Sequence, residues 1–410
     1  MRRFSITLLF FYFTAILNNS MVEARTNTES IDIEILEELT SFFSINQGVF
    51  EGAGRFLKEV ENSQFVVLGE LHNRQQISVF TVALLAEASK YGYQHFAVET
   101  GPYSAQKLHE LSSNSLTAVT HFYDEYSNKM FGIYPIPFFG GQADLKILEE
   151  VHKRKFKLWG LDQEFVFALP FIIDDLYEQY REKISERERE IYRRLKRSLF
   201  WKNLRAQLFS SYALSCEILQ SGEFLAFIEI FKVKDRSSSS IVDAISSSLN
   251  IYCLFESGSS KESNQIRINN FKQQFDKEFD RYRREQENEP KVIVKMGSYH
   301  SGRDRSPLNF HDIGHHLAEK ASQMKGRTLH VRFLNRFVEG KDMYLNKQHS
   351  KYHSFIKMGT TNQWSMIDLR PLRKKIELGE LVANKAETQV IKNYDIILIT
   401  PNDRKVATHY

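Results

Sequence analysis

Four short apolar segments, each followed by acidic or imidazole side chains, constrain the fold of this chain more than any other feature. The first is Phe65–Leu68, which runs through Gly69 into Glu70 and His72. A short run rich in β-branched and aromatic residues and closed by Gly is typical of a buried strand. The pattern recurs where 95–98 precedes Glu99, where 156–161 precedes Asp162, and where 292–297 precedes His300. If these segments are parallel strands of one sheet, their polar endings meet at the edge where α/β proteins bind ligands.

Helical patterns lie between these segments. Residues 77–90 place apolar side chains at helical spacing between the first two predicted strands, and 142–154 do the same before the third. A strand, a helix and a second strand in this order predict a right-handed crossover and parallel strands. Residues 30–62 and 307–323 are also predicted to be helical, and 328–333 and 394–400 to be strands. The predicted fold class is α/β, with a mainly parallel sheet flanked by helices and an inserted helical lid subdomain.

The composition changes after Pro170. From there to about residue 288 the pattern is helical and dense in charge, and it is interrupted by serine-rich stretches at 237–240 and 257–260. The predicted organisation is a signal peptide at 1–24, the first part of an α/β catalytic domain at 25–169, a helical insertion or lid at 170–288, and the remainder of the α/β domain at 289–410.

The N-terminus has the features of a targeting segment. Arg2 and Arg3 precede an apolar run from Phe4 to Leu17, and Val22 and Ala24 supply small residues for cleavage. The run is short for a membrane span, although an uncleaved anchor is the alternative. We therefore expect a secreted or periplasmic protein with no membrane contact beyond the signal peptide.

Net charge, cysteine spacing and the motifs that are missing exclude several classes of function. The formal charge is only +4, with cations and acids intermixed, so nucleic-acid binding is not indicated and a small-molecule substrate is expected. Cys216 and Cys253 are compatible with one disulfide or with two buried thiols, and are too distant in sequence for a CxxC redox motif. The sequence contains no Gly-x-Ser-x-Gly elbow and no phosphate-binding glycine loop, which disfavours serine hydrolases and nucleotide enzymes. Oligomeric state is not indicated.

Glu70 and His72 are the best candidates for acid–base chemistry. Two residues apart, both side chains can reach the same cleft at the end of a strand. A carboxylate beside an imidazole fixes its tautomer and raises its basicity, so that the ring can take a proton from water. The structural alternative is a helix-capping Glu70 and a His72 that serves only as a loop partner.

Further candidates follow the other strands: Glu99, Asp162, Glu164 and His300. Each alone is more often a cap or turn residue. Together they can hold a divalent metal through His72, His300 and one carboxylate, or run metal-free hydrolysis. Arg267, before the fourth strand, can bind a carboxylate or stabilise developing negative charge, although a surface arginine is the default. His311 and His315, four residues apart, fit a solvated helix face better than a metal site.

The order and spacing of these motifs resemble the erythromycin esterase and ChaN-like superfamily, which includes the TraB and TIKI proteins. The residues that carry the resemblance are 67–72, 97–99 and 295–300. The resemblance implies an α/β sheet with a deep cleft and an inserted helical part. It also implies that His72 activates water, that Glu70 and Glu99 support it, and that His300 and Arg267 face the substrate or its oxyanion. Asp162 falls at a matching strand end.

The first motif differs from that of the esterases. The single residue between Glu70 and His72 is closer to the spacing in ChaN-like haem-binding lipoproteins, although Asn73 stands where those proteins have Asp. The leading hypothesis is an esterase-like hydrolase that cleaves an ester or lactone with a His72-activated water and requires no cofactor. The alternatives are a haem-binding protein of iron uptake, supported by the aromatic stretch 119–141, and a TIKI-like peptidase that depends on a divalent metal.

Overall fold

A computed structural model of the chain describes residues 31–209, 211–286, 288–346 and 351–410. The predicted signal peptide therefore lies outside the described residues. In the described part, nine strands form one mixed sheet. In spatial order they are β2 (Val49–Glu51), β1 (Thr40–Asn46), β10 (Trp364–Asp368), β11 (Ile396–Thr400), β7 (Thr328–Asn335), β3 (Phe65–Glu70), β6 (Lys291–Gly297), β4 (Tyr93–Val98) and β5 (Lys157–Gly160).

The strands predicted to end in reactive side chains are neighbours in this sheet. The order β3-β6-β4-β5 is parallel throughout, as are the pairs that join β3 to β7 and β7 to β11. Glu70 pairs with Gly297, and Val98 pairs with both Lys295 and Gly160. The carboxyl ends of the strands therefore lie at one edge, and the predicted mainly parallel α/β fold is confirmed.

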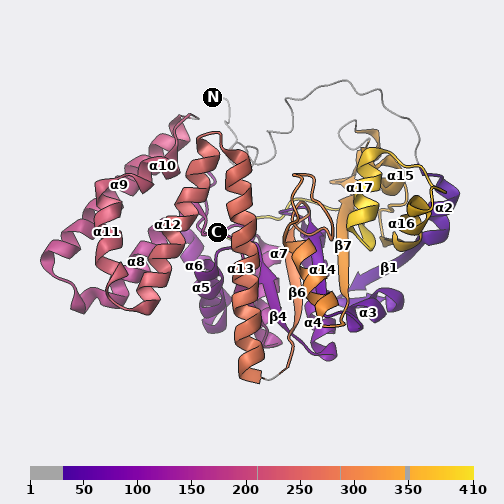
Figure 1. Cartoon of the computed structure of the whole chain (residues 1–410), viewed down its shortest axis with the longest axis horizontal. Helices are drawn as coiled ribbons and strands as arrows, with labels where there is room; N and C mark the ends of the chain where they lie inside the picture. Colours follow the sequence, from indigo (N-terminus) through magenta and orange to yellow (C-terminus); the bar gives the residue numbers. More distant parts are fainter. Residues whose placement is uncertain (1–30, 210, 287, 347–350) are drawn as a thin grey trace.

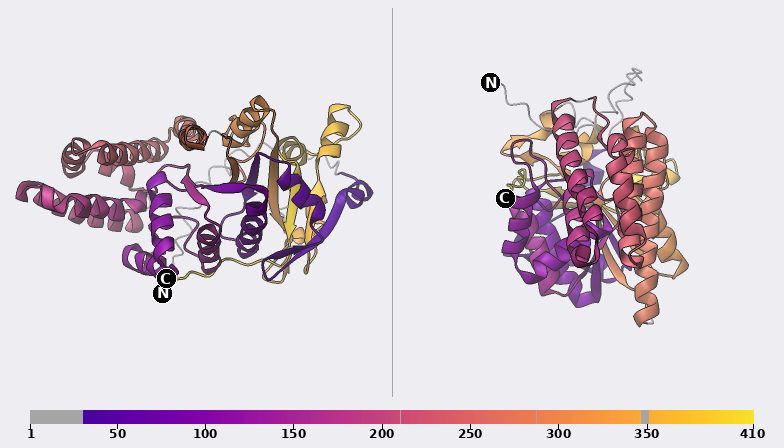
Figure 2. Two further views of the ribbon diagram at one scale, coloured as in Figure 1. Left: turned by 90° about the horizontal axis from the view of Figure 1, so that it is seen from below. Right: turned by 90° about the vertical axis from the view of Figure 1, so that its left-hand side faces the viewer.

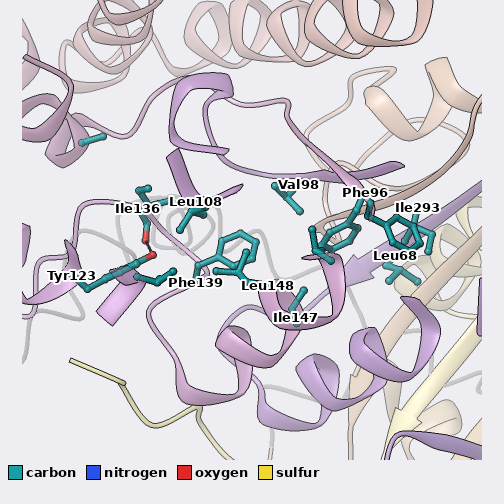
Figure 3. Packing of buried hydrophobic residues seen from close by; sticks show 14 of the residues in the cluster. Leu68, Phe96, Val98, Leu108, Tyr123, Ile136, Phe139, Ile147, Leu148 and Ile293 are labelled. Carbon is teal, nitrogen blue, oxygen red and sulfur yellow. Dashed lines mark hydrogen bonds between the residues drawn. The ribbon is translucent and has the colours of Figure 1, made fainter. Parts of the chain in front are cut away.

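Two helical layers bury the sheet because its central strands are apolar on both faces. Val66 and Leu68 belong to a core formed with helices on one face, whereas Phe65 and Val67 belong to a core on the opposite face. Figure 3 shows part of the first core, where Leu68, Phe96 and Ile293 from the strands lie near Ile147 and Leu148. The first core includes residues of α4 (Gln75–Ala88), α5 (Pro102–Asn114), α6 (Leu116–Tyr126) and α7 (Gln142–Lys153). The second core includes residues of α13 (Ser260–Gln286) and α14 (Ile313–Gln323).

A helical subdomain follows β5 and precedes β6. Its helices are α8 (Leu169–Tyr180), α9 (Glu186–Leu208), α10 (Leu214–Leu219), α11 (Gly222–Lys232), α12 (Arg236–Glu256) and α13. Figures 1 and 2 show α8, α9 and α11 projecting to one side of the sheet, away from α16 (Arg370–Glu377) and α17 (Lys385–Asn393). A disulfide between Cys216 and Cys253 joins α10 to α12, which decides between the two states left open by the sequence. No helix among the described residues is long and apolar enough to cross a bilayer.

Two predicted helical stretches were wrong in part. Residues 30–62 contain α2 (Ile33–Leu39) and α3 (Gly54–Glu61), but β1 and β2 lie between them. Phe43 stacks on Trp364 of β10, so pairing with a strand far along the chain overrides the local helical spacing. The stretch 307–323 becomes helical only at Ile313, where Asp312 caps α14 through the Ile313 backbone N–H. Among the described residues, the chain also forms the short helix α15 (His353–Ile356) and a separate pair of strands, β8 (Phe337–Val338) and β9 (Lys341–Asp342).

Candidate active site

Glu70, the last residue of β3, is held between two nitrogen groups. Its Oε2 lies 2.7 Å from the Nζ of Lys295 on the neighbouring β6, and its Oε1 lies 3.1 Å from the Nδ1 of His72. Burial alone would raise the pKa of Glu70, but Lys295 and His72 outweigh it and lower the pKa to about 2. Glu70 is therefore ionised at neutral pH beside the imidazole of His72.

Glu99, which follows β4, lies at the centre of the group. The backbone N–H of Gly297 donates to its Oε2 at 2.6 Å, and Arg267 donates to its Oε1 at 3.0 Å. His72 and His300 approach the same carboxylate, with their Nε2 atoms 3.6 Å and 3.8 Å from its oxygens. Burial opposes ionisation of Glu99, but the two imidazoles and Arg267 outweigh it and lower its pKa.

Arg267 is the residue of the helical subdomain that enters this group. From α13 it donates through Nε to Asp162 Oδ1 at 2.9 Å and through Nη2 to Oδ2 at 2.5 Å. This two-point contact, together with the bond to Glu99, fixes the guanidinium against two strand-end carboxylates. Although burial lowers the pKa of Arg267, Asp162 and Glu99 raise it overall, so the side chain stays cationic.

His300 is oriented by a residue that the sequence did not single out. Its Nδ1 lies 2.8 Å from Oδ2 of Asp312, whose Oδ1 accepts from the first backbone N–H of α14. The Phe271 ring packs edge to face against the imidazole of His300, with the ring centroids 5.1 Å apart. Burial lowers the pKa of His300, but Asp312 outweighs it, and the net pKa is raised. His300 therefore binds a proton more readily than a free histidine.

His72 is the accessible member of the group. Its side chain is 28% exposed, compared with 4% for both Glu70 and Glu99 and 8% for His300. The Phe138 ring stacks on the imidazole at 4.1 Å, and the loop that carries Phe138 belongs to the predicted aromatic stretch 119–141. A Cβ at Gly297 would lie 2.9 Å from Nε2 of His72, so only glycine permits this close approach of backbone and imidazole.

The last residues of the described chain support the loop that carries Phe138. The backbone N–H of Gln142 donates to the carbonyl of Ala407 at 2.7 Å. The backbone N–H of His409 donates to the carbonyl of Gly140 at 3.1 Å. The His409 ring contacts the carbonyl of Phe139 at 2.9 Å, and Tyr410 stacks on Tyr123. The aromatic neighbour of His72 is thus tied to the C-terminal segment.

The structure therefore brings five predicted catalytic residues and Arg267 together: His72, Glu70, Glu99, His300, Asp162 and Arg267. Lys295, Asp312 and Phe138 were not predicted. A lysine inside the apolar run 292–297 was the available signal, because a buried lysine requires an anionic partner. Asp312 lies in a loop without a comparable pattern, whereas Phe138 belongs to the aromatic stretch 119–141.

Two other predicted groups lie apart from these contacts. Glu164 accepts from the backbone N–H of Tyr103 at 2.7 Å and from the hydroxyl of Ser104 at 2.5 Å, and burial raises its pKa to about 7. His315 contacts the carbonyl of Arg303 at 2.9 Å and its ring packs on His311. Both observations favour structural roles. In the described ranges, no three His, Cys, Asp or Glu side chains form a group that could hold a metal ion.

Comparisons with known proteins identify the fold. No protein-family model and no curated protein matches the sequence. Among solved structures, a succinoglycan biosynthesis protein aligns with a TM-score of 0.53 and 14% identity, covering 91% of this chain and 97% of that one. A Bacillus cereus protein aligns with a TM-score of 0.52 and 12% identity over 92% and 98% of the two chains. A mutant of the erythromycin esterase EreC in its open conformation aligns with a TM-score of 0.50 and 15% identity over 85% and 93%. The chain therefore has an erythromycin esterase-like fold.

Proposed function

We propose that this protein is a hydrolase that cleaves an ester or lactone with a water molecule activated by His72. The observation that carries the proposal is the placement of His72, which is partly exposed while its Nδ1 faces the buried anion Glu70 and its Nε2 lies 3.6 Å from Glu99. The erythromycin esterase-like fold supports the reaction class. Macrolides and other lactones are therefore reasonable first substrates.

The contacts of His72 give it the properties of a general base. Because Glu70 is ionised, it favours the tautomer in which Nδ1–H donates to Glu70 and Nε2 carries the lone pair. A water at Nε2 can then attack the ester carbonyl as its proton passes to the ring, and Glu70 stabilises the resulting imidazolium. The imidazolium returns the proton to the departing alkoxide, which leaves the carboxylic acid and the alcohol.

His300 is placed to stabilise the negative charge on the carbonyl oxygen. Asp312 fixes its Nδ1 and raises its pKa, so that Nε2 can carry a proton. The distance of 3.8 Å from Nε2 to Glu99 is too long for a hydrogen bond, which leaves this N–H available to an oxyanion. Arg267 is already bonded to Asp162 and Glu99, which favours a positioning role, and its direct contact with substrate stays a prediction.

Haem binding and metal-dependent peptidase activity stay alternative predictions. The donors around the carboxylates favour acid–base chemistry, because Glu70, Glu99 and Asp162 already accept from Lys295, Gly297 and Arg267.

The Cys216–Cys253 disulfide supports a secreted or periplasmic location, since disulfides persist in oxidising compartments.

Substitution of His72 tests the proposal. We expect His72→Ala to lower the turnover of a responsive ester or lactone by about 10²–10⁴-fold, the usual contribution of a general base. His315→Ala is the matched control, because this imidazole is also partly exposed but contacts Arg303 and Glu319 instead. Equal turnover by wild type and His72→Ala would exclude His72 from the mechanism.

A further inference from the structure

The end of α9 exposes a group of large apolar side chains. Phe200 is 62% exposed, Trp201 59%, Leu208 61%, and Phe209 just beyond the helix 59%. The rings of Phe200 and Trp201 contact each other edge to face, with their centroids 5.3 Å apart, so they form one exposed aromatic pair. We call these four residues the α9 aromatic patch. Scattered single exposures need no explanation, but several large apolar side chains on one helix end mark an interaction surface.

Cations surround the α9 aromatic patch. The helix carries eight Lys and Arg residues and three Glu residues, and all three acids lie in its first turns at 186–190. No acidic residue follows in the sequence until Glu217. Lys202 and Arg205 therefore lie among the exposed rings without an acid nearby on their own helix. This half of α9 combines positive charge with exposed apolar area.

A hollow of about 360 Å³ lies beside the patch. Its lining includes Arg194, Arg197, Lys202 and Arg205, with Trp201 at its side and Glu223 of α11 (Gly222–Lys232) as the acidic contribution. Arg194 and Arg197 also pair with Glu190, at 3.2 Å each. Four cations against one lining carboxylate fit a phosphate group, and the adjacent indole fits the apolar region beneath a phospholipid headgroup.

We propose that the α9 aromatic patch and this hollow dock the helical subdomain on a membrane surface that contains anionic phospholipids. Exposed Trp and Phe insert into the interfacial region, while Lys and Arg contact lipid phosphates. Helix α9, which carries the patch, projects to one side of the sheet (Figure 1). This proposal departs from the expectation of no membrane contact beyond the signal peptide, and it is independent of the proposed hydrolysis.

Charge favours a lipid over a second copy of the chain as the occupant. If two α9 surfaces faced each other, Lys202 and Arg205 of each would approach the same cations of the other copy. Such like-charge contacts oppose association. An anionic bilayer instead complements the cations and accepts the aromatic side chains.

Vesicle sedimentation tests the proposal with the full disulfide-bonded chain. We expect binding to mixed phosphatidylcholine–phosphatidylglycerol vesicles and little binding to phosphatidylcholine alone. The double variant Lys202→Gln with Arg205→Gln should bind the mixed vesicles about 30-fold more weakly, at the usual contribution of each cation near an anionic surface. Trp201→Ser should also weaken binding, by about tenfold or more, through the loss of buried apolar area.

The matched control is Lys374→Gln with Lys375→Gln on α16, which removes the same charge from the opposite side of the molecule. We expect this variant to bind like the wild type. Absent binding to anionic vesicles, equal binding to neutral vesicles, or equal weakening by the control would overturn the proposal. So would a dimer in sedimentation velocity that Trp201→Ser abolishes while vesicles leave the wild type unbound.

Discussion

The strand-end site and helix α9 use the same charged residue types in opposite settings. In the site, Lys295 and Glu70 are both buried, and they come from neighbouring strands far apart in sequence. On α9, Arg194 and Glu190 are one helical turn apart, and their side chains are 65% and 38% exposed. The first pair depends on the whole sheet, whereas the second needs only the helix.

This difference determines what each contact contributes. A buried charge that loses its partner stays in a medium of low polarity, so breaking a buried pair is strongly destabilising. An exposed pair exchanges one solvated state for another and contributes little. The site is therefore expected to be rigid and sensitive to substitution. The surface of α9 is instead free to change, or to serve another purpose such as membrane contact.

The largest expected effect comes from removing the cation beside Glu70. Lys295→Met should lower the free energy of unfolding by about 3–5 kcal/mol, because Glu70 is left as a buried anion without its lysine partner. Urea unfolding followed by circular dichroism measures the change. Lys277→Met, an exposed position on α13, is the control and should change stability by less than about 0.5 kcal/mol. A small effect at Lys295 would remove the contrast between the two regions.

Acid titration tests the contribution of one buried carboxyl, that of Glu70. Glu70 has a pKa of about 2 in the folded chain against an ordinary value of 4.5, so its ionised form stabilises the folded state. This contribution, about 3 kcal/mol in full, is present above about pH 4.5 and is lost as the pH falls toward 2. We expect the stability difference between wild type and Glu70→Gln to shrink over that interval. A difference that is constant with pH would contradict the assigned role of Glu70.

The smallest effect is expected on α9. Arg194→Ala should change the free energy of unfolding by less than about 0.5 kcal/mol, because the broken contact with Glu190 is exposed. The measurement is the same urea series. Destabilisation as large as that of Lys295→Met would show that exposure does not separate the two regions.

The sequence predicted the centre of the sheet better than its edge. Strands β3 and β6 are buried on both faces, which produces continuous apolar runs that periodicity and turn residues reveal. Strand β1 is mostly half-exposed, and it is defined by pairing with β10 rather than by its own pattern. Local reasoning therefore extended the neighbouring helix across Phe42 and Phe43.

The same distinction holds in the site. Glu70 ends β3, His72 lies two residues beyond it, and Glu99 directly follows β4, so the sheet alone brings them together. Asp312 reaches His300 only because a loop returns to begin α14, and Phe138 reaches His72 through a long connection. Contacts of this kind depend on tertiary packing, which no periodic pattern in the chain encodes.

The packing of the final residues matters for anyone who produces this protein. Tyr410 stacks on Tyr123, and the His409 ring contacts the carbonyl of Phe139, so residues 409 and 410 are anchored close to the ring that stacks on His72. An affinity tag or fluorescent fusion attached after Tyr410 would disturb these contacts with Tyr123 and Phe139. A loss of function in such a fusion would therefore report on the position of the label rather than on the native protein.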